Sequence, residues 1–248
     1  MGKPVKKLEY ANAADGATFA DVQESIETPV RLTKVSILKH LRTTAYRTIK
    51  RLFDIFVGIV GCLLTIPLLG IVKLYNLKHD DHAPLLYAQV RVGKNGKLFK
   101  VYKIRSMVHD ADAKLAKLLE ENAALRAEWE QNHKLKNDPR ITRVGRFLRK
   151  TSLDEFPQFW NILIGEMSLV GPRPLAVGEL DLHGGDHALY ESVKPGLTGW
   201  WGANGRSDTD YEHRLNLEYF YAKNASLVLD FTCIIKTLLS VFKRKGAV

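Results

Sequence analysis

The stretch LFDIFVGIVGCLLTIPLLGIV, Leu52 to Val72, decides the fold, because its 21 residues include a single charged side chain, Asp54. As a straight helix it would be about 30 Å long, which is enough to cross the apolar core of a bilayer. Pro67 removes one backbone donor and clashes with the preceding turn, so a bend is expected near residues 63–66. The sequence therefore predicts a bent helix embedded in a membrane.

Positive charge flanks this stretch on both sides. Residues 31–51 carry seven Lys and Arg and no acid, and Lys73, Lys78 and the basic segment 91–105 follow it. Because Lys and Arg concentrate on the cytoplasmic side of membranes, both ends are predicted to lie at that face, as in a re-entrant helix. A simple spanning anchor and the buried core helix of a soluble protein are the alternatives.

Composition excludes several classes of protein. A hydrophobic content of 46% over 248 residues excludes a disordered chain. The net charge of +10 lies in clusters, which indicates an anionic partner such as nucleic acid, a lipid surface or a phosphorylated substrate. Cys62 and Cys233, both in apolar segments, argue against a disulfide framework or a zinc site. The first 30 residues contain no apolar core, so no secretory signal peptide is expected.

The predicted fold class is α/β, predominantly helical with a small β-hairpin, and the chain divides into three parts. These are a polar and then basic leader, partly disordered, over residues 1–45, a re-entrant membrane helix over 46–76, and a catalytic domain on the cytoplasmic face over 77–248. Asn95-Gly96 is a two-residue hairpin turn signal, with strands near 85–93 and 97–104.

Two further helices are predicted from their apolar spacing. Residues 108–133 place leucines and Trp129 at helical intervals. Residues 226–248, SLVLDFTCIIKTLLSVFKRKGAV, carry apolar residues on one broad face and end in basic ones. This pattern predicts an amphipathic helix at the membrane interface, although a core helix with a basic C-terminus fits nearly as well.

The stretch RKTSLDEFPQFWNILIG, Arg149 to Gly165, places Asp154 and Glu155 side by side at the expected start of a helix. One interpretation is purely structural. Ser152 followed three residues later by Glu155 is a capping box, which stabilises a helix by about 1 kcal/mol.

A second interpretation gives Asp154 a chemical role. Helical spacing stacks Asp154, Gln158 and Asn161 on one face, where they could line a cleft. Pro157 loosens the first turn in a way that a capped helix would not need. The helix N-terminus and the nearby arginines are expected to keep Asp154 ionised, and an ionised carboxylate is a nucleophile toward phosphorus. The apolar residues of the opposite face are Leu153, Phe156, Trp160 and Leu163.

Several stretches, taken in order, resemble the bacterial sugar transferases, also called monotopic phosphoglycosyl transferases. They are KRLFDI at the start of the apolar segment, RVGKNGKLFKVYKIRSM, DPRITRVGRFLRKTSLDEFPQFWNILIGEMSLVGPRPL, KPGLTGW and NGR. Together they cover Lys50 to Arg206, with looser similarity to the end of the chain. A match this long and ordered is highly specific.

The resemblance implies a reaction. Members of this family move a sugar-1-phosphate from a UDP-sugar to polyprenyl (undecaprenyl) phosphate, release UMP and use Mg²⁺, in exopolysaccharide, capsule or glycoconjugate synthesis. Matched to the family's motif, Asp154 is the covalent nucleophile. Glu155 either helps to hold Mg²⁺ or takes part in proton transfer, and Asp154 is a second candidate ligand of the ion. The candidate phosphate clamps are Lys103, Arg105, Arg149 and Arg173, and the candidate nucleotide or sugar contacts are Gln158, Trp200, Asn204 and Arg206.

The resemblance also implies a location at the cytoplasmic face of the bacterial inner membrane, with no nucleic acid as partner; a homodimer is left open.

The sequence departs from the family pattern in two places. Ile66 stands where the family commonly has Ser before the proline of the bend, and Trp201-Gly202 replace Ala-Gln. Trp200 could stack on a base or sugar or lie at the membrane interface. The rival hypothesis is a membrane-tethered module that binds nucleic acid or anionic lipid without chemistry. The sugar and the polymer are not specified.

Overall fold

A computed structural model describes residues 34–132, 135–204 and 210–242 of the chain. Residues 1–33 of the predicted leader therefore lie outside the described residues. Contacts divide the chain into Met1–Thr44 and Ala45–Val248. Of the first unit only the beginning of helix α2 is described, and the architecture below is that of the second unit.

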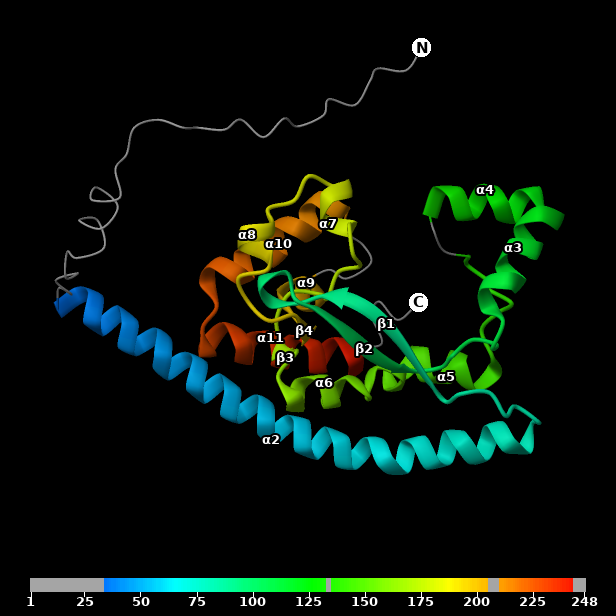
Figure 1. Cartoon of the computed structure of the whole chain (residues 1–248), viewed down its shortest axis with the longest axis horizontal. Helices are drawn as coiled ribbons and strands as arrows, with labels where there is room; N and C mark the ends of the chain where they lie inside the picture. The colour runs from blue at the N-terminus through cyan, green and yellow to red at the C-terminus, as the bar shows by residue number, and fades with distance from the viewer. Residues whose placement is uncertain (1–33, 133–134, 205–209, 243–248) are drawn as a thin grey trace, which may run out of the picture. The chain divides into compact units, whose positions relative to one another are not determined.

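Helix α2, Lys34–Lys78, contains the whole apolar stretch and begins earlier than predicted. Figure 1 shows it as one bent helix rather than two separate ones, with Pro67 inside it. Its Thr43–Lys78 part is long and apolar enough to cross a membrane. The Thr65 hydroxyl lies 2.7 Å from the Gly61 carbonyl oxygen and 3.3 Å from that of Phe156. Thr65 thus ties the helix to a neighbouring segment, and the re-entrant path stays a prediction.

One face of α2 packs against helix α6, Gln158–Ile164, through small residues. A Cβ atom added at Gly61 would lie 2.1 Å from the ring of Phe159, and one at Gly58 would lie 3.0 Å from the Cα of Leu163. No side chain larger than hydrogen fits at Gly61 unless Phe159 moves. The two glycines let the helices approach closely.

The charged residues at the start of the apolar stretch point into the protein. Arg51 donates to the carbonyl oxygens of Ile162 and Leu163, at 2.8 and 2.7 Å, and so satisfies carbonyls in the last turn of α6. Asp54, 3% exposed, accepts hydrogen bonds from the Ser168 hydroxyl at 3.0 Å and the Leu169 amide at 2.9 Å. These contacts fix α2 to the rest of the domain.

The predicted hairpin is present, but its turn differs. Strands β1, Leu86–Val92, and β2, Leu98–Ile104, pair in antiparallel register, with Tyr87 opposite Lys103. A short 3₁₀ helix, Lys94–Gly96, replaces the two-residue turn. Asn95 and Gly96 both have positive φ, 57° and 74°, which is the conformation that Asn and Gly accept most readily.

The single helix predicted over residues 108–133 was wrong. Two helices occupy this region, α3, Ala111–Glu121, and α4, Ala123–Asn132. Asn122 separates them because its side-chain oxygen accepts from the amides of Ala124 and Leu125, at 3.0 and 3.1 Å, and so caps the second helix.

The remaining elements complete a mostly helical domain (Figure 1). The sequence did not predict the parallel pairing of β3, Ser168–Val170, with β4, Gly196–Thr198. Close approach of Gly171 and Gly196 permits it, since a Cβ added at Gly196 would lie 2.1 Å from the Gly171 nitrogen. The other helices are α5 Arg143–Thr151, 3₁₀ helix η2 Leu153–Glu155, α7 Glu179–Leu182, α8 His187–Tyr190, α9 Trp200–Asn204, α10 Tyr211–Asn224 and α11 Leu227–Phe242.

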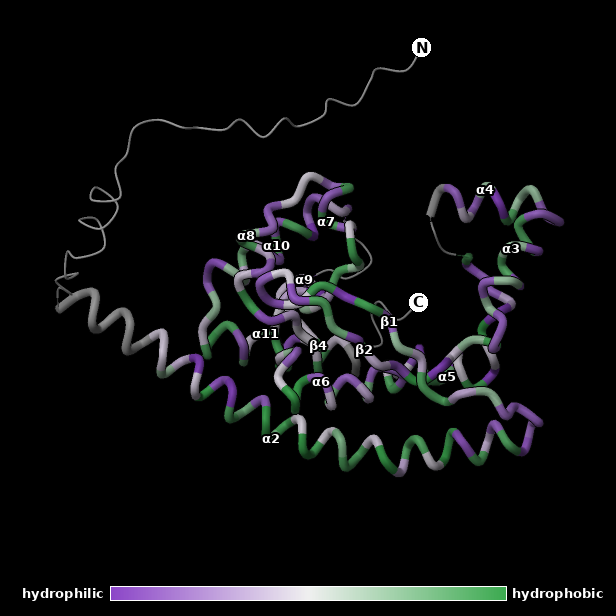
Figure 2. The backbone as a smooth tube through the Cα atoms, in the orientation of Figure 1, coloured by the Kyte–Doolittle hydropathy of each residue, from purple (hydrophilic) through white to green (hydrophobic). Residues whose placement is uncertain are grey.

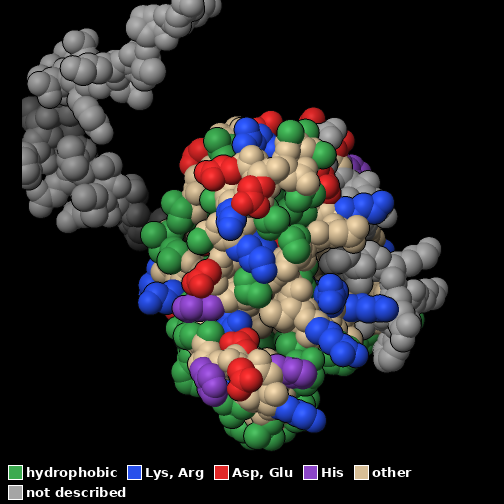
Figure 3. All heavy atoms as spheres, turned by 90° about the vertical axis from the view of Figure 1, so that its right-hand side faces the viewer, with side chains coloured by type: hydrophobic (Ala, Val, Ile, Leu, Met, Phe, Trp, Pro, Cys, Tyr) green, Lys and Arg blue, Asp and Glu red, His purple; other side chains and the backbone are tan. Residues whose placement is uncertain are grey.

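Apolar side chains remain exposed along one side of the domain. Helix α11 buries Cys233 and leaves apolar residues 51–78% exposed: Val228, Phe231, Ile235, Leu238 and Leu239. Leu52, Phe56 and Leu63 of α2 are likewise more than 60% exposed. Figure 2 shows the hydrophobic residues of α2, and Figure 3 shows hydrophobic side chains among acidic, basic and His side chains on the face in view. An exposed apolar surface of this kind fits the predicted interfacial helix.

Arg51→Gln tests the docking of α2. Removing two hydrogen bonds from a charged donor to terminal carbonyls should lower the free energy of unfolding by about 2 kcal/mol or more. Thermal unfolding in detergent measures this as a fall in Tm of several degrees. Arg47→Gln, at an exposed position one turn earlier on the same helix, is the matched control and should leave Tm unchanged. Equal Tm values for the two variants would contradict the docking role.

Candidate functional site

The segment that carries Asp154 and Glu155 begins with a sharp turn. Ser152 has a φ of 57° and ends α5, because its amide donates to the Arg149 carbonyl at 3.1 Å. Its side chain makes no capping hydrogen bond to the following turn, so the predicted capping box was wrong. Asp154 and Glu155 instead lie in the 3₁₀ turn η2, and α6 begins only after Pro157.

Glu155 is paired with a residue from the hairpin. Lys103 on β2 donates to a Glu155 carboxylate oxygen at 2.7 Å, and both side chains are 36% exposed. An ion pair this exposed contributes little to stability. Its role is to hold the carboxylate pair against the strand and to bring a cation beside Asp154.

Asp154 has a partly buried carboxyl group with opposing electrostatic neighbours. Burial raises the pKa of Asp154, and the adjacent Glu155 raises it further, while Lys103 and Arg149 act in the opposite direction. The net effect of the surroundings is therefore to raise the pKa of Asp154, whereas its ionisation at neutral pH stays a prediction. The physical reason is that desolvation outweighs the two cations, and no long helix begins at this residue.

The predicted phosphate clamps have different surroundings. Arg149, in the last turn of α5, donates from Nε to the Ser106 hydroxyl at 2.8 Å and adds positive charge near Asp154. Arg105 was predicted as a clamp, but its side chain is 9% exposed and binds both carboxylate oxygens of Asp81, at 2.8 and 2.9 Å. Arg105 therefore joins the segment that follows α2 to the hairpin, and its contact with a substrate phosphate stays a prediction.

Gln158 and Asn161, which were expected to stack with Asp154 along one helix face, do not line a cleft. Gln158 is 3% exposed and Asn161 is fully buried. The Asn161 side-chain amide donates to the Lys100 carbonyl oxygen at 2.7 Å and fixes α6 to β2, so its role is structural. Trp160, which was placed on the buried apolar face, is 51% exposed. The helix is rotated relative to the prediction because it packs against the hairpin on one side and α2 on another.

The candidate nucleotide or sugar contacts Trp200 and Asn204 are the first and last residues of the short helix α9. The Asn204 side chain donates to the Trp200 carbonyl at 2.7 Å, and Lys236 of α11 lies 4.6 Å above the Trp200 ring. Both residues therefore contact the exposed apolar helix. Arg206 lies outside the described residues. Arg173 belongs to a third group, with a side chain that is 42% exposed and 3.8 Å from Glu179.

Sequence reasoning missed several residues that organise the site. Arg51 and Asp54 were treated as part of a basic flank and a lone charge, although both are structural anchors. Ser106 accepts a hydrogen bond from Arg149. It directly follows Lys103-Ile104-Arg105 in the quoted motif, but the neighbouring residues do not indicate this contact. Away from this turn, the ion pairs of Glu179 with Arg91 and Arg214 were also not predicted.

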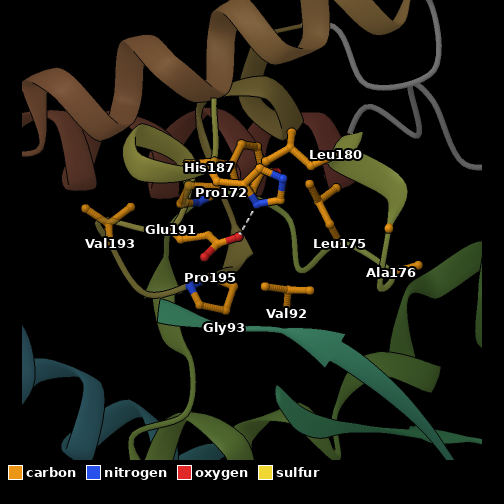
Figure 4. A pocket seen from close by; sticks show the side chains of 12 residues that line it. Val92, Gly93, Pro172, Leu175, Ala176, Leu180, His187, Glu191, Val193 and Pro195 are labelled. Carbon is orange, nitrogen blue, oxygen red and sulfur yellow. Dashed lines mark hydrogen bonds and ion pairs between the residues drawn. The ribbon is translucent and has the colours of Figure 1, made fainter. Parts of the chain in front are cut away.

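A cavity at the Val92 end of β1 is too small for a substrate. Figure 4 shows it above that strand, with His187 and Glu191 joined by a 2.7 Å hydrogen bond and the apolar side chains of Val92, Leu175 and Leu180 around it. Its volume of about 20 Å³ accommodates a single water molecule.

The carboxylates of Asp154 and Glu155 are oxygen ligands of the kind that Mg²⁺ prefers. Mg²⁺ typically binds one or two carboxylates and completes its coordination with water and substrate phosphate. Within the described part of the chain, three or more His, Cys, Asp or Glu side chains do not gather at any one point as a metal site. The two adjacent acids therefore fit a cation that is shared with a phosphorylated substrate.

Comparison with known proteins agrees with the geometry. The sequence matches the family described as bacterial sugar transferase over residues 45–244. It is 46% identical over 211 residues to the undecaprenyl-phosphate galactose phosphotransferase of Salmonella typhimurium, covering 85% of this chain and 44% of that protein. It is 40% identical over 198 residues to the exopolysaccharide production protein ExoY of Rhizobium meliloti, covering 80% and 87%.

A third relative is the UDP-glucose:undecaprenyl-phosphate glucose-1-phosphate transferase of Klebsiella pneumoniae, 38% identical over 207 residues, covering 80% of this chain and 41% of that protein. The chain thus spans less than half the length of the Salmonella and Klebsiella proteins and most of the length of ExoY. The resemblance drawn from the motifs is confirmed: the chain belongs to the bacterial sugar transferase family.

Proposed function

We propose that the protein transfers a sugar-1-phosphate from a UDP-sugar to undecaprenyl phosphate, with release of UMP, as a priming step of polysaccharide or glycoconjugate synthesis. The observation that carries this proposal is the turn η2, which holds Asp154 and Glu155 beside Lys103 and Arg149. The named activities of the Salmonella and Klebsiella relatives support the same class of substrates.

The first step is proposed to be attack by an Asp154 carboxylate oxygen on the phosphorus atom bonded to the sugar. A bond forms between this oxygen and phosphorus, the bond from phosphorus to the bridging oxygen breaks, and UMP leaves with the bond electrons. Lys103 and Arg149 favour this step because they offset the repulsion between a carboxylate and a phosphate. The product is a phosphosugar covalently bound to Asp154.

The second step is proposed to be attack by a phosphate oxygen of undecaprenyl phosphate on the same phosphorus atom. The Asp154 carboxylate leaves, and the sugar is joined to the lipid through a diphosphate. The raised pKa of Asp154 reflects a carboxylate that is poorly stabilised by its surroundings, which makes it a better nucleophile when it is ionised.

Asp154 and Glu155 would hold Mg²⁺ when it is bound. The ion would neutralise charge on the substrate phosphates. Lys103 keeps Glu155 in place, and its own charge is then partly balanced by that carboxylate. Glu155 is therefore proposed as a positioning residue for the cation and Asp154 as the reacting group.

The exposed apolar residues of α2 and α11 support attachment to the cytoplasmic leaflet of the inner membrane. One substrate is soluble in water and the other is a lipid, so a catalytic turn fixed near the interface lets each enter from its own phase. Both ends of α2 are proposed to lie on the cytoplasmic side, because positive charge flanks the apolar stretch on both sides.

The reaction is tested by incubating the purified chain with Mg²⁺, undecaprenyl phosphate and a panel of UDP-sugars, and measuring UMP. At least one donor should release UMP in an amount that depends on the lipid. Glu155→Gln should lower the rate roughly 100-fold or more by weakening the cation site. Absence of UMP with every donor would contradict the proposal and would favour a binding module without chemistry.

The path of α2 is tested by cysteine labelling in sealed vesicles. Ala45→Cys and Lys78→Cys, each introduced after Cys62 and Cys233 are replaced by Ser, should both react with an impermeant reagent from the cytoplasmic side. Labelling of the two positions from opposite sides would show a spanning helix instead.

A further inference from the structure

Two positively charged side chains meet at the C-terminal end of α6. The Nη2 atom of Arg51 and the Nζ atom of Lys194 each lie 3.2 Å from the position that a Cβ atom would take at Gly165. Apart from the chain neighbours of Gly165, the three heavy atoms nearest to that position all belong to these two side chains. Neither side chain forms an ion pair with a described residue. We call Arg51, Gly165 and Lys194 the cation site.

Arg51 is held in place without losing its charge. Its guanidinium group donates to the carbonyl oxygens of Ile162 and Leu163, at 2.8 and 2.7 Å. Both acceptors are neutral, so they fix the group but do not balance its positive charge. A guanidinium group has five N–H donors, and two hydrogen bonds leave others for a ligand.

The Lys194 ammonium group lacks a partner of its own. It is partly buried and makes no hydrogen bond to a described residue. Burial lowers the pKa of Lys194, and the positive charges of Arg51, Lys94 and Lys50 act in the same direction, against the opposing charge of Asp54. A partly buried cation without an acceptor carries a cost in free energy, which a bound anion would remove.

Gly165 leaves the space beside the two cations unfilled. Its φ of 89° lies in the region that favours glycine, and its amide ends α6 by donating to the carbonyl oxygens of Asn161 and Ile162, at 3.1 Å each. The helix therefore stops at a residue that has no side chain, next to the two positive groups. An anion that approaches Gly165 meets both of them.

Apolar side chains border the cation site on both helices. Trp160 and Ile164, one turn apart on α6, are 51% and 47% exposed, and Leu52 and Phe56, one turn apart on α2, are 63% and 64% exposed. Ile164 and Leu52 are each next in the chain to a residue of the cation site. Figure 1 shows α6 alongside α2. Positive charge beside an exposed apolar surface fits a ligand with an anionic head and an apolar tail, and tryptophan is enriched at membrane interfaces.

The cation site lies away from the turn that carries Asp154. Thr65 of α2 contacts Phe156 near the beginning of α6, whereas Arg51 contacts the last turn of α6. Arg51 and Thr65 are 14 residues apart on α2, which corresponds to about 21 Å of helix. A phosphate bound at Gly165 is therefore not the phosphate that Asp154 is proposed to attack.

We propose that the cation site binds the phosphate group of a membrane phospholipid, which is a structural ligand and neither of the two substrates. Arg51 and Lys194 would hold the phosphate oxygens beside Gly165, and the acyl chains would cover the exposed apolar residues of α6 and α2. An anionic phospholipid such as phosphatidylglycerol is favoured, because its net negative charge offsets the unbalanced cations. The assignment rests on the membrane attachment given under the proposed function.

Titration of phosphatidylglycerol into the full chain in a nonionic detergent, followed by Tm, tests the assignment. Bound lipid should raise the Tm of the parent. Lys194→Gln should weaken lipid binding about tenfold or more, because it removes a charge-assisted contact. Lys194→Arg keeps the positive charge and should retain most of the affinity.

Lys78→Gln is the matched control. Lys78 is exposed in the last turn of α2, at the other end of the apolar stretch from Arg51. Both glutamine variants change the net charge equally, so a general attraction to anionic lipid would weaken equally in both, whereas a built site weakens only in Lys194→Gln. Without lipid, the Tm of Lys194→Gln should be no lower than that of the parent, because the ammonium group has no described hydrogen-bond partner.

Four results would overturn the assignment. They are equal lipid affinity in Lys194→Gln and the parent, an equal loss in Lys78→Gln, a lipid-free Tm of Lys194→Gln below that of the parent, and a rise in Tm with inorganic phosphate as large as that with phosphatidylglycerol at the same concentration. Displacement of phosphatidylglycerol by undecaprenyl phosphate in the parent, but not in Lys194→Gln, would also overturn it and assign the site to the substrate lipid.

The lipid site and the proposed transfer reaction fail separately. Asp154→Asn should bind phosphatidylglycerol as the parent does. Loss of lipid binding in Lys194→Gln, without UMP release from any donor in the parent, would leave the lipid site standing and remove the transferase. Turnover by the parent, with lipid affinity unchanged in Lys194→Gln, would do the reverse.

Discussion

The docking of α2 onto α6 and β3 is the constraint on which the rest of the structure depends. An apolar helix does not by itself favour one packing orientation, because all of its faces are similarly hydrophobic. Here Arg51, Gly58, Gly61 and Thr65 define one face that fits α6, while large apolar side chains occupy the others. Asp54 can be buried in this position only because β3 donates two hydrogen bonds to it.

This docking couples the exposed apolar surface of α2 to the turn that carries Asp154 and Glu155. Arg51 holds the end of α6, Thr65 contacts Phe156 near its beginning, and Asp154 lies just before that helix. A shift of α2 would therefore move the turn that carries the proposed nucleophile. On its other side the same turn is joined to the hairpin by the ion pair between Lys103 and Glu155, so Asp154 lies between the apolar helix α2 and the hairpin. Under the proposed function, this position would let a lipid and a soluble substrate reach the same carboxylate.

Sequence patterns predicted the features that depend on residues close together in the chain. The apolar stretch predicted α2, Asn95-Gly96 predicted a hairpin, and the ordered motifs identified the family. Predictions from local patterns were wrong where a residue's contact partner lies far away in the sequence. Ser-x-x-Glu looks like a capping box, but α5 uses Ser152 as its end residue, and Glu155 binds Lys103, 52 residues earlier in the chain. Likewise Arg105 and Arg149 look equivalent in sequence, and only the position of Asp81 shows that Arg105 is already paired.

The proposed covalent bond between Asp154 and the phosphosugar can be detected by mass spectrometry. The chain is quenched during reaction with the productive UDP-sugar in the absence of a lipid acceptor. We expect an added mass equal to the sugar phosphate on the peptide that contains Asp154. This adduct should be lost when undecaprenyl phosphate is added and should never form in Asp154→Asn. Turnover by Asp154→Asn at the parent rate, or an adduct located on another residue, would contradict it.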